Sequence, residues 1–282
     1  MKTAIRFLSD RFFVSGLFLV AIFAFALPLV YAGTADEAWR LYRQGEYGKA
    51  YTIFKDGAEK GDPALQYGYG VFLAEGKSGK RNEAEAAMWF RKAAEQGNAE
   101  AQNSLGDMYD QSRGVKQDLG HAIVWYQKAA DQGYAPAQNN LGRMYENSRG
   151  TRRDYAKAVY HYINAAKQDY PPAQYHLGLM YARGWGVAQD VPRAAEWVRK
   201  SGQQGYAEAM YILAQMLENG HGVTKNVREA LSWYKKAADA GQDRAMERLA
   251  HVYTTGDLGE EKNMTLAQSW YEKTRAVRKQ RR

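Results

Sequence analysis

A pair of adjacent residues, aromatic at one or both positions, returns through this 282-residue chain at an almost constant interval. Each pair follows the last after 36 residues, and the final pair after 37: Trp89-Phe90, Trp125-Tyr126, His161-Tyr162, Trp197-Val198, Trp233-Tyr234 and Trp270-Tyr271. An alanine stands three residues before every pair, from Ala86 to Ala267. A fixed period of this length in helix-forming residues is typical of a stacked-repeat protein, in which each unit contacts only its neighbours.

A second pattern with the same period follows each pair. An alanine precedes a Leu-Gly or Leu-Ala couplet by four residues, and a Tyr or Leu follows four residues later: Ala101, Leu105-Gly106, Tyr109; Ala137, Leu141-Gly142, Tyr145; Ala173, Leu177-Gly178, Tyr181; Ala209, Leu213-Ala214, Leu217; Ala245, Leu249-Ala250, Tyr253. Apolar residues spaced by four lie on one face of a helix. Each unit is therefore predicted to hold two amphipathic helices of about three turns, joined by a short turn.

The glycines support this reading. Gly97, Gly133, Gly205 and Gly241 stand at the predicted turn, and Asp169 takes the same place once. Gly106, Gly142 and Gly178 instead lie inside a predicted helix, where glycine costs roughly 1 kcal/mol relative to alanine. A cost repeated at one position implies close contact with another helix there. We predict an all-α fold, an α/α solenoid of about seven helix pairs with a 36-residue period.

Residues 1–32 do not follow the repeat. Lys2, Arg6 and Arg11 precede an uncharged run from Phe12 to Val30, and Val30-Tyr31-Ala32 carries small residues at the two cleavage-site positions. This is the layout of a secretory signal peptide. An uncleaved anchor is the alternative, since about 19 to 21 apolar residues would span a bilayer. In both cases the repeat body is expected outside the cytoplasm, because the positive flank stays inside.

Charge and cysteine content exclude several classes of protein. The chain has no cysteine, so a lipoprotein anchor, a disulfide framework and thiolate chemistry are ruled out. Residues 33–272 contain 30 basic and 30 acidic residues, and six basic residues are gathered in 273–282. A neutral body argues against a nucleic-acid groove. The basic tail is interpreted as a solvated helix end, with weak binding to a membrane surface or an acidic partner as the alternative.

The repeat unit resembles the Sel1-like repeat. The resemblance is carried by Ala-x-x-Trp-Tyr-x-Lys-Ala-Ala-x-x-Gly-x-x-x-Ala-Gln-x-x-Leu-Gly-x-Met-Tyr, with a closing Gly-x-Gly-Val, as read from Ala122 to Arg149 and from Ala158 to Val187. It covers about residues 50 to 275. The resemblance implies an α/α solenoid related to tetratricopeptide repeats, a scaffold role for other proteins, and export in bacteria. Periplasmic or secreted localisation is therefore expected, or inner-membrane anchoring if the signal is not cleaved.

The repeat body, 33–282, is predicted to be a single domain because no linker interrupts it. Residues 36–60 depart from the repeat and have the shorter turn of a tetratricopeptide unit, so they are predicted to form an N-terminal cap. Residues 264–282 are predicted to form a C-terminal capping helix with the basic tail.

The tests for chemistry in the sequence are negative. Ser232 and Lys235 fit the Ser-x-x-Lys of penicillin-binding enzymes, but no partner motif occurs. No histidine has a second histidine at helical zinc-site spacing, so neither a metal nor a cofactor is predicted. Asp118, Asp154 and Asp190 recur with the repeat and are read as N-caps. We predict that the chain is not an enzyme.

A partner is expected on the helix that bears Leu-Gly, which lines the concave side in the tetratricopeptide proteins that the resemblance points to. Positions that vary between repeats and are predicted to face outward include Asn103, Asn139, Tyr175 and Tyr211 in one column, and Asp107 and Arg143 in another. Amides can bracket a peptide backbone, and tyrosines offer rigid amphipathic area. The loop residues Trp185 and His221, where earlier loops have Arg113 and Arg149, are further candidates. A solvated face is the alternative for all of these positions.

These observations favour an exported scaffold that binds a protein or peptide. The alternatives are a binder of peptidoglycan or carbohydrate, through an aromatic stripe, and a hydrolase acting on cell-wall or β-lactam substrates. The sequence leaves the partner and the oligomeric state open.

Overall fold

The structure of this chain is a computed structural model that describes residues 34–77 and 79–280. Residues 34–43 form a first helix, and thirteen further helices follow in the described ranges: α2 (Tyr47–Glu59), α3 (Pro63–Glu75), α4 (Glu83–Glu95), α5 (Ala99–Gln111), α6 (Leu119–Asp131), α7 (Ala135–Glu146), α8 (Tyr155–Ala166), α9 (Pro171–Arg183), α10 (Val191–Gln203), α11 (Ala207–Asn219), α12 (Val227–Asp239), α13 (Asp243–Thr255) and α14 (Met264–Gln280). No strand occurs in these ranges. The predicted all-α solenoid of about seven helix pairs is confirmed.

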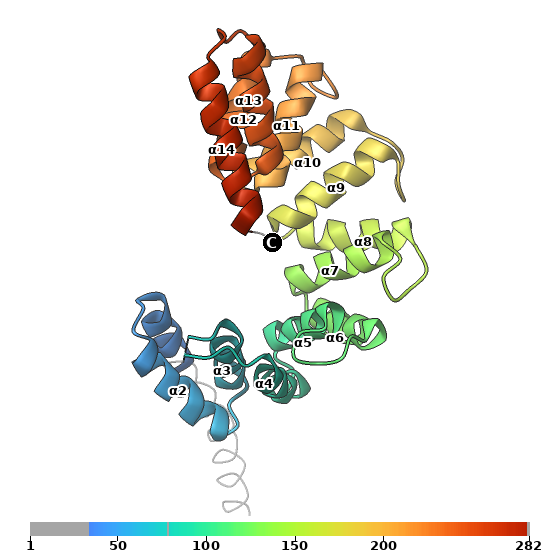
Figure 1. The fold of residues 1–282 in the computed structure, drawn as a ribbon. Helices are drawn as coiled ribbons and strands as arrows, with labels where there is room; N and C mark the ends of the chain where they lie inside the picture. The colour runs from blue at the N-terminus through green and yellow to red at the C-terminus, as the bar shows by residue number, and fades with distance from the viewer. Residues whose placement is uncertain (1–33, 78, 281–282) are drawn as a thin grey trace, which may run out of the picture. The chain divides into compact units, whose positions relative to one another are not determined.

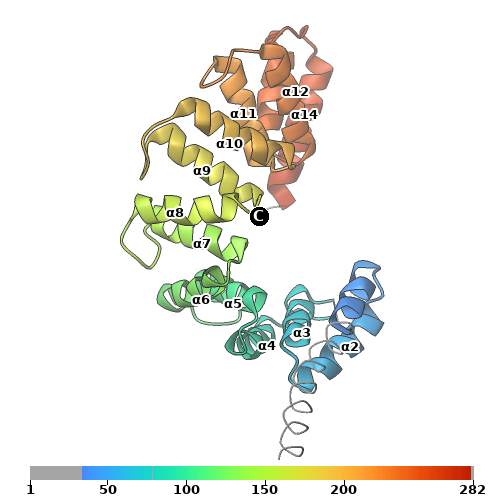
Figure 2. The ribbon, with the colours of Figure 1, turned by 180° about the vertical axis from the view of Figure 1, so that it is seen from behind.

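The chain divides into two compact units at the boundary between Ala122 and Ile123. The first unit contains the helix over 34–43 and α2 to α5, and the second contains α7 to α14, while α6 includes the boundary. In the second unit each helix lies beside the next in chain order, as both views show (Figures 1 and 2). The predicted signal peptide lies outside the described residues.

Two kinds of helix alternate. We call α4, α6, α8, α10, α12 and α14 the aromatic helices, since they carry the aromatic pairs, and α3, α5, α7, α9, α11 and α13 the Leu-Gly helices. Asp154 and Asp190 cap aromatic helices as predicted, each accepting a backbone N–H at 2.9 Å, from Lys157 and Arg193. Asp169 has φ +57°, the left-handed conformation that Gly133 and Gly205 adopt at the same turn.

The glycines within the Leu-Gly helices mark close contacts between helices. A Cβ added to Gly142 would lie 2.5 Å from Tyr162 Cε1, and one added to Gly178 would lie 2.7 Å from Val198 Cγ2. Tyr162 and Val198, the second residues of their aromatic pairs, therefore pack directly on the backbone of the preceding Leu-Gly helix. The predicted reason for these glycines is confirmed at both positions.

The two members of an aromatic pair have different environments. The second member is buried in five of the six pairs, and Tyr126, Tyr162 and Tyr234 are at 1 % exposure or less, whereas Tyr271 in the last pair is 40 % exposed. The tryptophan that precedes it is half-buried in most repeats, and a lysine three residues later covers its ring: Lys92 on Trp89 at 3.9 Å, Lys128 on Trp125 at 4.1 Å, Lys200 on Trp197 at 4.5 Å, Lys236 on Trp233 at 4.5 Å and Lys273 on Trp270 at 4.1 Å. Each lysine lies over the ring face at cation–π distance.

A buried glutamine links four of the Leu-Gly helices, α3, α5, α7 and α9, to the helices around them. Gln138 Nε2 donates to the backbone oxygen of Ala130 at 3.3 Å, and Gln168 Nε2 donates to Gln138 Oε1 at 2.9 Å. Gln174 repeats the arrangement with Ala166 and Gln204 in the next unit of the repeat. These amides give the helix-end carbonyls of Ala130 and Ala166 a second donor, beside the backbone N–H groups of Gly133 and Asp169.

Candidate functional site

The eight candidate residues lie on two kinds of element, Leu-Gly helices and the loops that follow them. Asn103 and Asp107 lie on α5 in the first unit. In the second unit Asn139 and Arg143 lie on α7, Tyr175 on α9 and Tyr211 on α11, whereas Trp185 and His221 lie in the loops after α9 and α11. Asn139, Tyr175 and Tyr211 occupy the same repeat position on successive Leu-Gly helices.

The expectation that Asn103 and Asn139 face outward is wrong. Asn103 is 9 % exposed and Asn139 is 4 % exposed. Asn103 Nδ2 donates to Asp107 Oδ2 at 3.3 Å, while Asn139 Oδ1 is buried without a hydrogen-bond partner. An amide side chain is too short to reach beyond the neighbouring helices, whereas a tyrosine at the same position reaches the surface. Periodicity places these residues at one repeat position but does not predict how deeply each side chain is buried.

Tyr175 and Tyr211 are half-buried and held in place by other rings. The Tyr175 ring lies 5.4 Å from the Tyr206 ring, and the Tyr211 ring lies 5.8 Å from the Tyr234 ring. Gln215 Nε2 donates to the Tyr211 hydroxyl at 3.0 Å. Burial raises the pKa of Tyr175 and of Tyr211, so both phenols stay protonated at neutral pH. Each can donate a hydrogen bond at the surface.

The remaining candidates differ in exposure. Arg143 and His221 are exposed, and Asp107 is half-buried. The Trp185 ring is stacked on the Tyr155 ring, with centroids 4.8 Å apart. The Arg183 guanidinium lies over the Trp185 ring, 4.5 Å from its centroid. The Trp185 ring is therefore packed within its own unit, with a guanidinium beside it.

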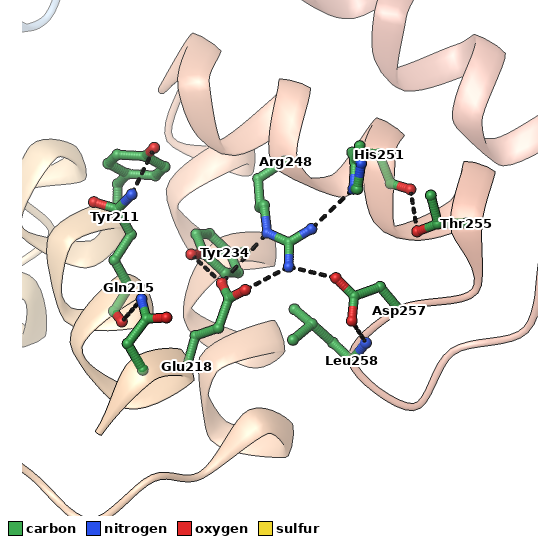
Figure 3. A network of polar contacts seen from close by, with 10 residues as sticks. Tyr211, Gln215, Glu218, Tyr234, Arg248, His251, Thr255, Asp257 and Leu258 are labelled. Carbon is green, nitrogen blue, oxygen red and sulfur yellow. Dashed lines mark hydrogen bonds and ion pairs between the residues drawn. The ribbon is translucent and has the colours of Figure 1, made fainter. Parts of the chain in front are cut away.

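A network of charged groups that the sequence did not reveal joins α11, α12 and α13 (Figure 3). Arg248 binds Glu218 through two nitrogens, Nη2 at 2.5 Å and Nε at 3.3 Å, and its Nη2 also lies 2.6 Å from Asp257 Oδ2. Tyr234 donates its hydroxyl hydrogen to Glu218 at 2.7 Å. Burial would raise the pKa of Glu218, but the hydrogen bonds from Arg248 and Tyr234 outweigh it, and the pKa is lowered. Glu218 is thus a partly buried carboxylate.

The same three repeat positions form a related group two repeats earlier. Tyr162 donates its hydroxyl hydrogen to Glu146 at 2.6 Å, and the His176 ring is stacked on the Tyr162 ring with centroids 5.0 Å apart. Burial, and then the positive charges of Arg143 and Arg183, lower the pKa of His176 to about 4. His176 therefore stands neutral in the place that Arg248 takes in the charged network. The shared spacing of Glu146 with Tyr162 and of Glu218 with Tyr234 is the signal that could have revealed both groups.

The described residues offer no catalytic arrangement around Ser232. Ser232 is exposed, and Lys235 Nζ lies 3.0 Å from Glu260 Oε1. Although burial acts to lower it, the pKa of Lys235 is raised by its hydrogen bonds to Glu260 and Tyr253, which favours the protonated amine. Over 34–77 and 79–280, no group of three or more His, Asp or Glu side chains is placed to hold a metal ion. In the same ranges no helix combines the length and apolar character that crossing a bilayer requires.

The fold and its periodic contacts define the protein class: a tetratricopeptide-like α/α solenoid. The Sel1 repeat family profile matches six consecutive segments, residues 63–98, 99–134, 135–170, 171–206, 207–242 and 243–274. The chain therefore belongs to the Sel1 repeat family. Solenoids of this family are generally protein-interaction scaffolds without catalysis.

Three solved structures illustrate the relationship. A Sel1 repeat protein from Oxalobacter formigenes is 33 % identical with a TM-score of 0.78, and the match covers 86 % of this chain and 96 % of that one. The protein c5321, a protective antigen present in uropathogenic Escherichia coli strains, is 37 % identical with a TM-score of 0.67 over 86 % of this chain. The match covers 53 % of c5321, so this chain spans about half its length. The immunity protein Pa5087 from Pseudomonas aeruginosa, at 24 % identity and a TM-score of 0.55 over 76 % of this chain and 81 % of its own, shares the fold. No curated protein matched the chain.

Proposed function

We propose that this chain is an exported, non-catalytic scaffold that binds a partner protein or peptide on the Leu-Gly helices of its second unit. The observation that carries the proposal is the pair Tyr175 and Tyr211, which occupy one repeat position on successive helices. Each ring is held by a neighbouring ring, and each phenol is protonated. Tyrosines fixed in this way bind a partner with little loss of side-chain entropy, as residues that dominate interfaces do.

Arg143 adds a charged group to this surface. It is exposed on α7, the Leu-Gly helix before the one that carries Tyr175. A guanidinium next to aromatic surface favours a partner segment with an acidic or carbonyl group beside an apolar side chain. Asn103 and Asn139 are left out of the proposed contact surface because their side chains are buried.

The cell-wall alternatives have less support. A sugar-binding stripe needs open aromatic faces, but lysines cover the tryptophan rings of five repeats. A Ser-x-x-Lys hydrolase needs a lysine that can take up a proton, and Lys235 is held protonated. We therefore propose no catalytic role for Ser232.

Capture of partners from an envelope extract tests the proposal. The variant with Tyr175→Ala and Tyr211→Ala should retrieve clearly less of the partner than the parent chain. The matched control carries Tyr160→Ala and Tyr271→Ala, which removes two tyrosines that are 62 % and 40 % exposed on aromatic helices. If both double variants capture the same partner at the parent yield, the proposed surface is wrong.

Export is tested separately. N-terminal sequencing of the protein from an extracytoplasmic fraction should begin near Gly33, since Val30-Tyr31-Ala32 fits a cleavage site. Recovery of membrane-bound protein that still begins at Met1 would show an anchored protein instead.

A further inference from the structure

A cavity of about 460 Å³ lies in the first unit, between the ends of α3 and α5 and the loops that follow them. Lys77, Arg81 and Arg113 line it, and Glu75 is the one acidic residue among the lining side chains. Phe90 and Met108 supply apolar surface. The cavity is large enough for a side chain from another molecule and combines positive charge with an apolar wall.

The charges around this cavity are unequally paired. Glu75 accepts a hydrogen bond from the Tyr42 hydroxyl, and Arg81 Nη2 lies 2.5 Å from Glu83 Oε1. Arg113 Nε, in contrast, is buried without a hydrogen-bond partner. A guanidinium N–H without an acceptor is costly, so the hydrogen bonds of Arg113 are not all satisfied within the chain.

The repeats of the second unit show what fills this place elsewhere. Ala74, Phe90 and Ser104, which all line the cavity, stand at the repeat positions of Glu218, Tyr234 and Arg248 four repeats later. In that later network a carboxylate, Glu218, occupies the site and pairs with a guanidinium (Figure 3). In the first unit alanine replaces the glutamate, and the space stays open.

The charged residues also differ between the cavity and the later network of Glu218, Arg248 and Asp257. Arg113 stands at the repeat position of Asp257, which pairs with Arg248 in the later network. The cavity thus keeps a guanidinium at its edge but has lost the carboxylate that the same fold holds at Glu218. What it lacks is an anionic group the size of a glutamate carboxylate.

We propose that this cavity binds a carboxylate of a partner peptide, with an adjacent apolar side chain of that peptide against Phe90 and Met108. The carboxylate is either the peptide's C-terminus or an Asp or Glu side chain. Arg113 donates to it, as arginine does in charge-assisted pairs with carboxylates. This inference rests on the proposed function only in taking the partner to be a protein or peptide.

Four fluorescein-labelled peptides test the proposal by fluorescence anisotropy with the full chain. They share the sequence Gly-Ser-Ala-Leu-Glu and differ in having a free or amidated C-terminus and Glu or Gln at the last position. The peptide with neither carboxylate should bind at least about tenfold more weakly than the peptide with both. If affinity falls only on amidation, the cavity binds the terminal carboxylate of the peptide. If affinity falls only on substitution of Glu by Gln, the cavity binds the side-chain carboxylate. Equal binding of all four peptides, or none, would overturn the proposal.

Variants locate the binding in this cavity. Arg113→Gln should weaken binding of the carboxylate peptide at least about tenfold. Lys116→Gln, an equal loss of charge on an exposed residue of the same loop, should leave the binding affinity unchanged. Ala74→Glu places the chain's own carboxylate where Glu218 lies in the later repeat, so it should abolish peptide binding with the melting temperature maintained. The guanidinium N–H resonances of Arg113 should shift only with carboxylate peptides. An Ala74→Glu chain that is folded and binds at parent affinity would refute the site.

The two proposals fail separately. Tyr175→Ala with Tyr211→Ala is expected to leave peptide affinity for the cavity unchanged, because these residues belong to the second unit. Partner capture that depends on the tyrosines but not on Arg113 would therefore leave the proposed function intact while removing the carboxylate site.

Discussion

His176 Nδ1 lies 3.6 Å from Glu146 Oε2, on the two repeat positions at which Arg248 and Glu218 form an ion pair two repeats later. The backbone arrangement is shared, but the charge is not. Arg248 cannot lose its proton, whereas burial holds His176 neutral with a pKa of about 4. One position in the repeat therefore gives a permanent ion pair in one place and a titratable contact in the other.

The first prediction is that His176 makes stability depend on pH below neutrality. Its pKa is lowered from 6.5 to about 4 in the folded chain, so protons bind the unfolded chain first as the pH falls. Its contribution should be complete above pH 6.5 and lost between pH 6.5 and 4, by up to about 3 kcal/mol. Urea unfolding at several pH values measures this loss.

His176→Gln provides the control for that experiment. Burial also lowers the pKa of His161, which acts in the same direction. The contribution of His176 is therefore the difference between the parent chain and His176→Gln in how steeply the free energy of unfolding changes with pH. Parallel curves would show that the imidazole is as easily protonated in the folded chain as in the unfolded one.

The second prediction compares two arginines that each contact two acidic side chains. Arg248 and its partner Glu218 are 19 % and 20 % exposed, whereas the Arg278 side chain is 48 % exposed with Asp243 and Glu247 as partners. Arg248→Ala leaves the partly buried Glu218 carboxylate without its cation and should lower the free energy of unfolding by about 3 kcal/mol. Arg278→Ala should leave it nearly unchanged, because exposed pairs contribute little. Similar losses in urea titrations of both variants would contradict this account.

The third prediction concerns helix glycines. Gly142→Ala should destabilise the chain by about 1–3 kcal/mol, because the added methyl group meets Tyr162 at 2.5 Å. Gly48 lies in α2 with no atom within 4 Å of an added Cβ, so Gly48→Ala should stabilise by up to about 1 kcal/mol. Thermal unfolding of both variants gives the sign directly. A stabilising Gly142→Ala would mean that α7 and α8 separate more easily than the packing indicates.

The fourth prediction follows from the two buried asparagines. Asn139→Leu removes a buried acceptor without a partner and should maintain or raise the melting temperature. Asn103→Leu instead breaks the hydrogen bond to Asp107 and should lower it. Replacing Asn103, Asn139, Tyr175 and Tyr211 together is accordingly expected to weaken folding, and for that reason partner capture is better tested with the tyrosines alone. A rise in melting temperature for Asn103→Leu would contradict the hydrogen bond as a stabilising contact.

Much of the fold could be predicted because the same pattern of residues, and with it the same local structure, recurs in each repeat. The N-caps at Asp154 and Asp190, the left-handed turn at Asp169 and the close contact at Gly142 are all local or nearest-neighbour features, and a fixed period exposes them. The Sel1 motif followed from the same positions. The burial of individual side chains was harder to predict from the sequence, as Asn139 shows, because it depends on how far neighbouring helices extend around a short side chain.

The sequence by itself determined the helices, their order and the positions at which they touch, since these follow from a 36-residue period and from the sizes of recurring residues. Only the tertiary structure decided which variable residues meet. Glu218, Tyr234 and Arg248 come from three helices, and Ala74, Ser104 and Arg113 gather around an open cavity at the corresponding place. Glu218 lies 16 residues from Tyr234 and 30 from Arg248 in sequence, and these residues become neighbours only because the helices stack.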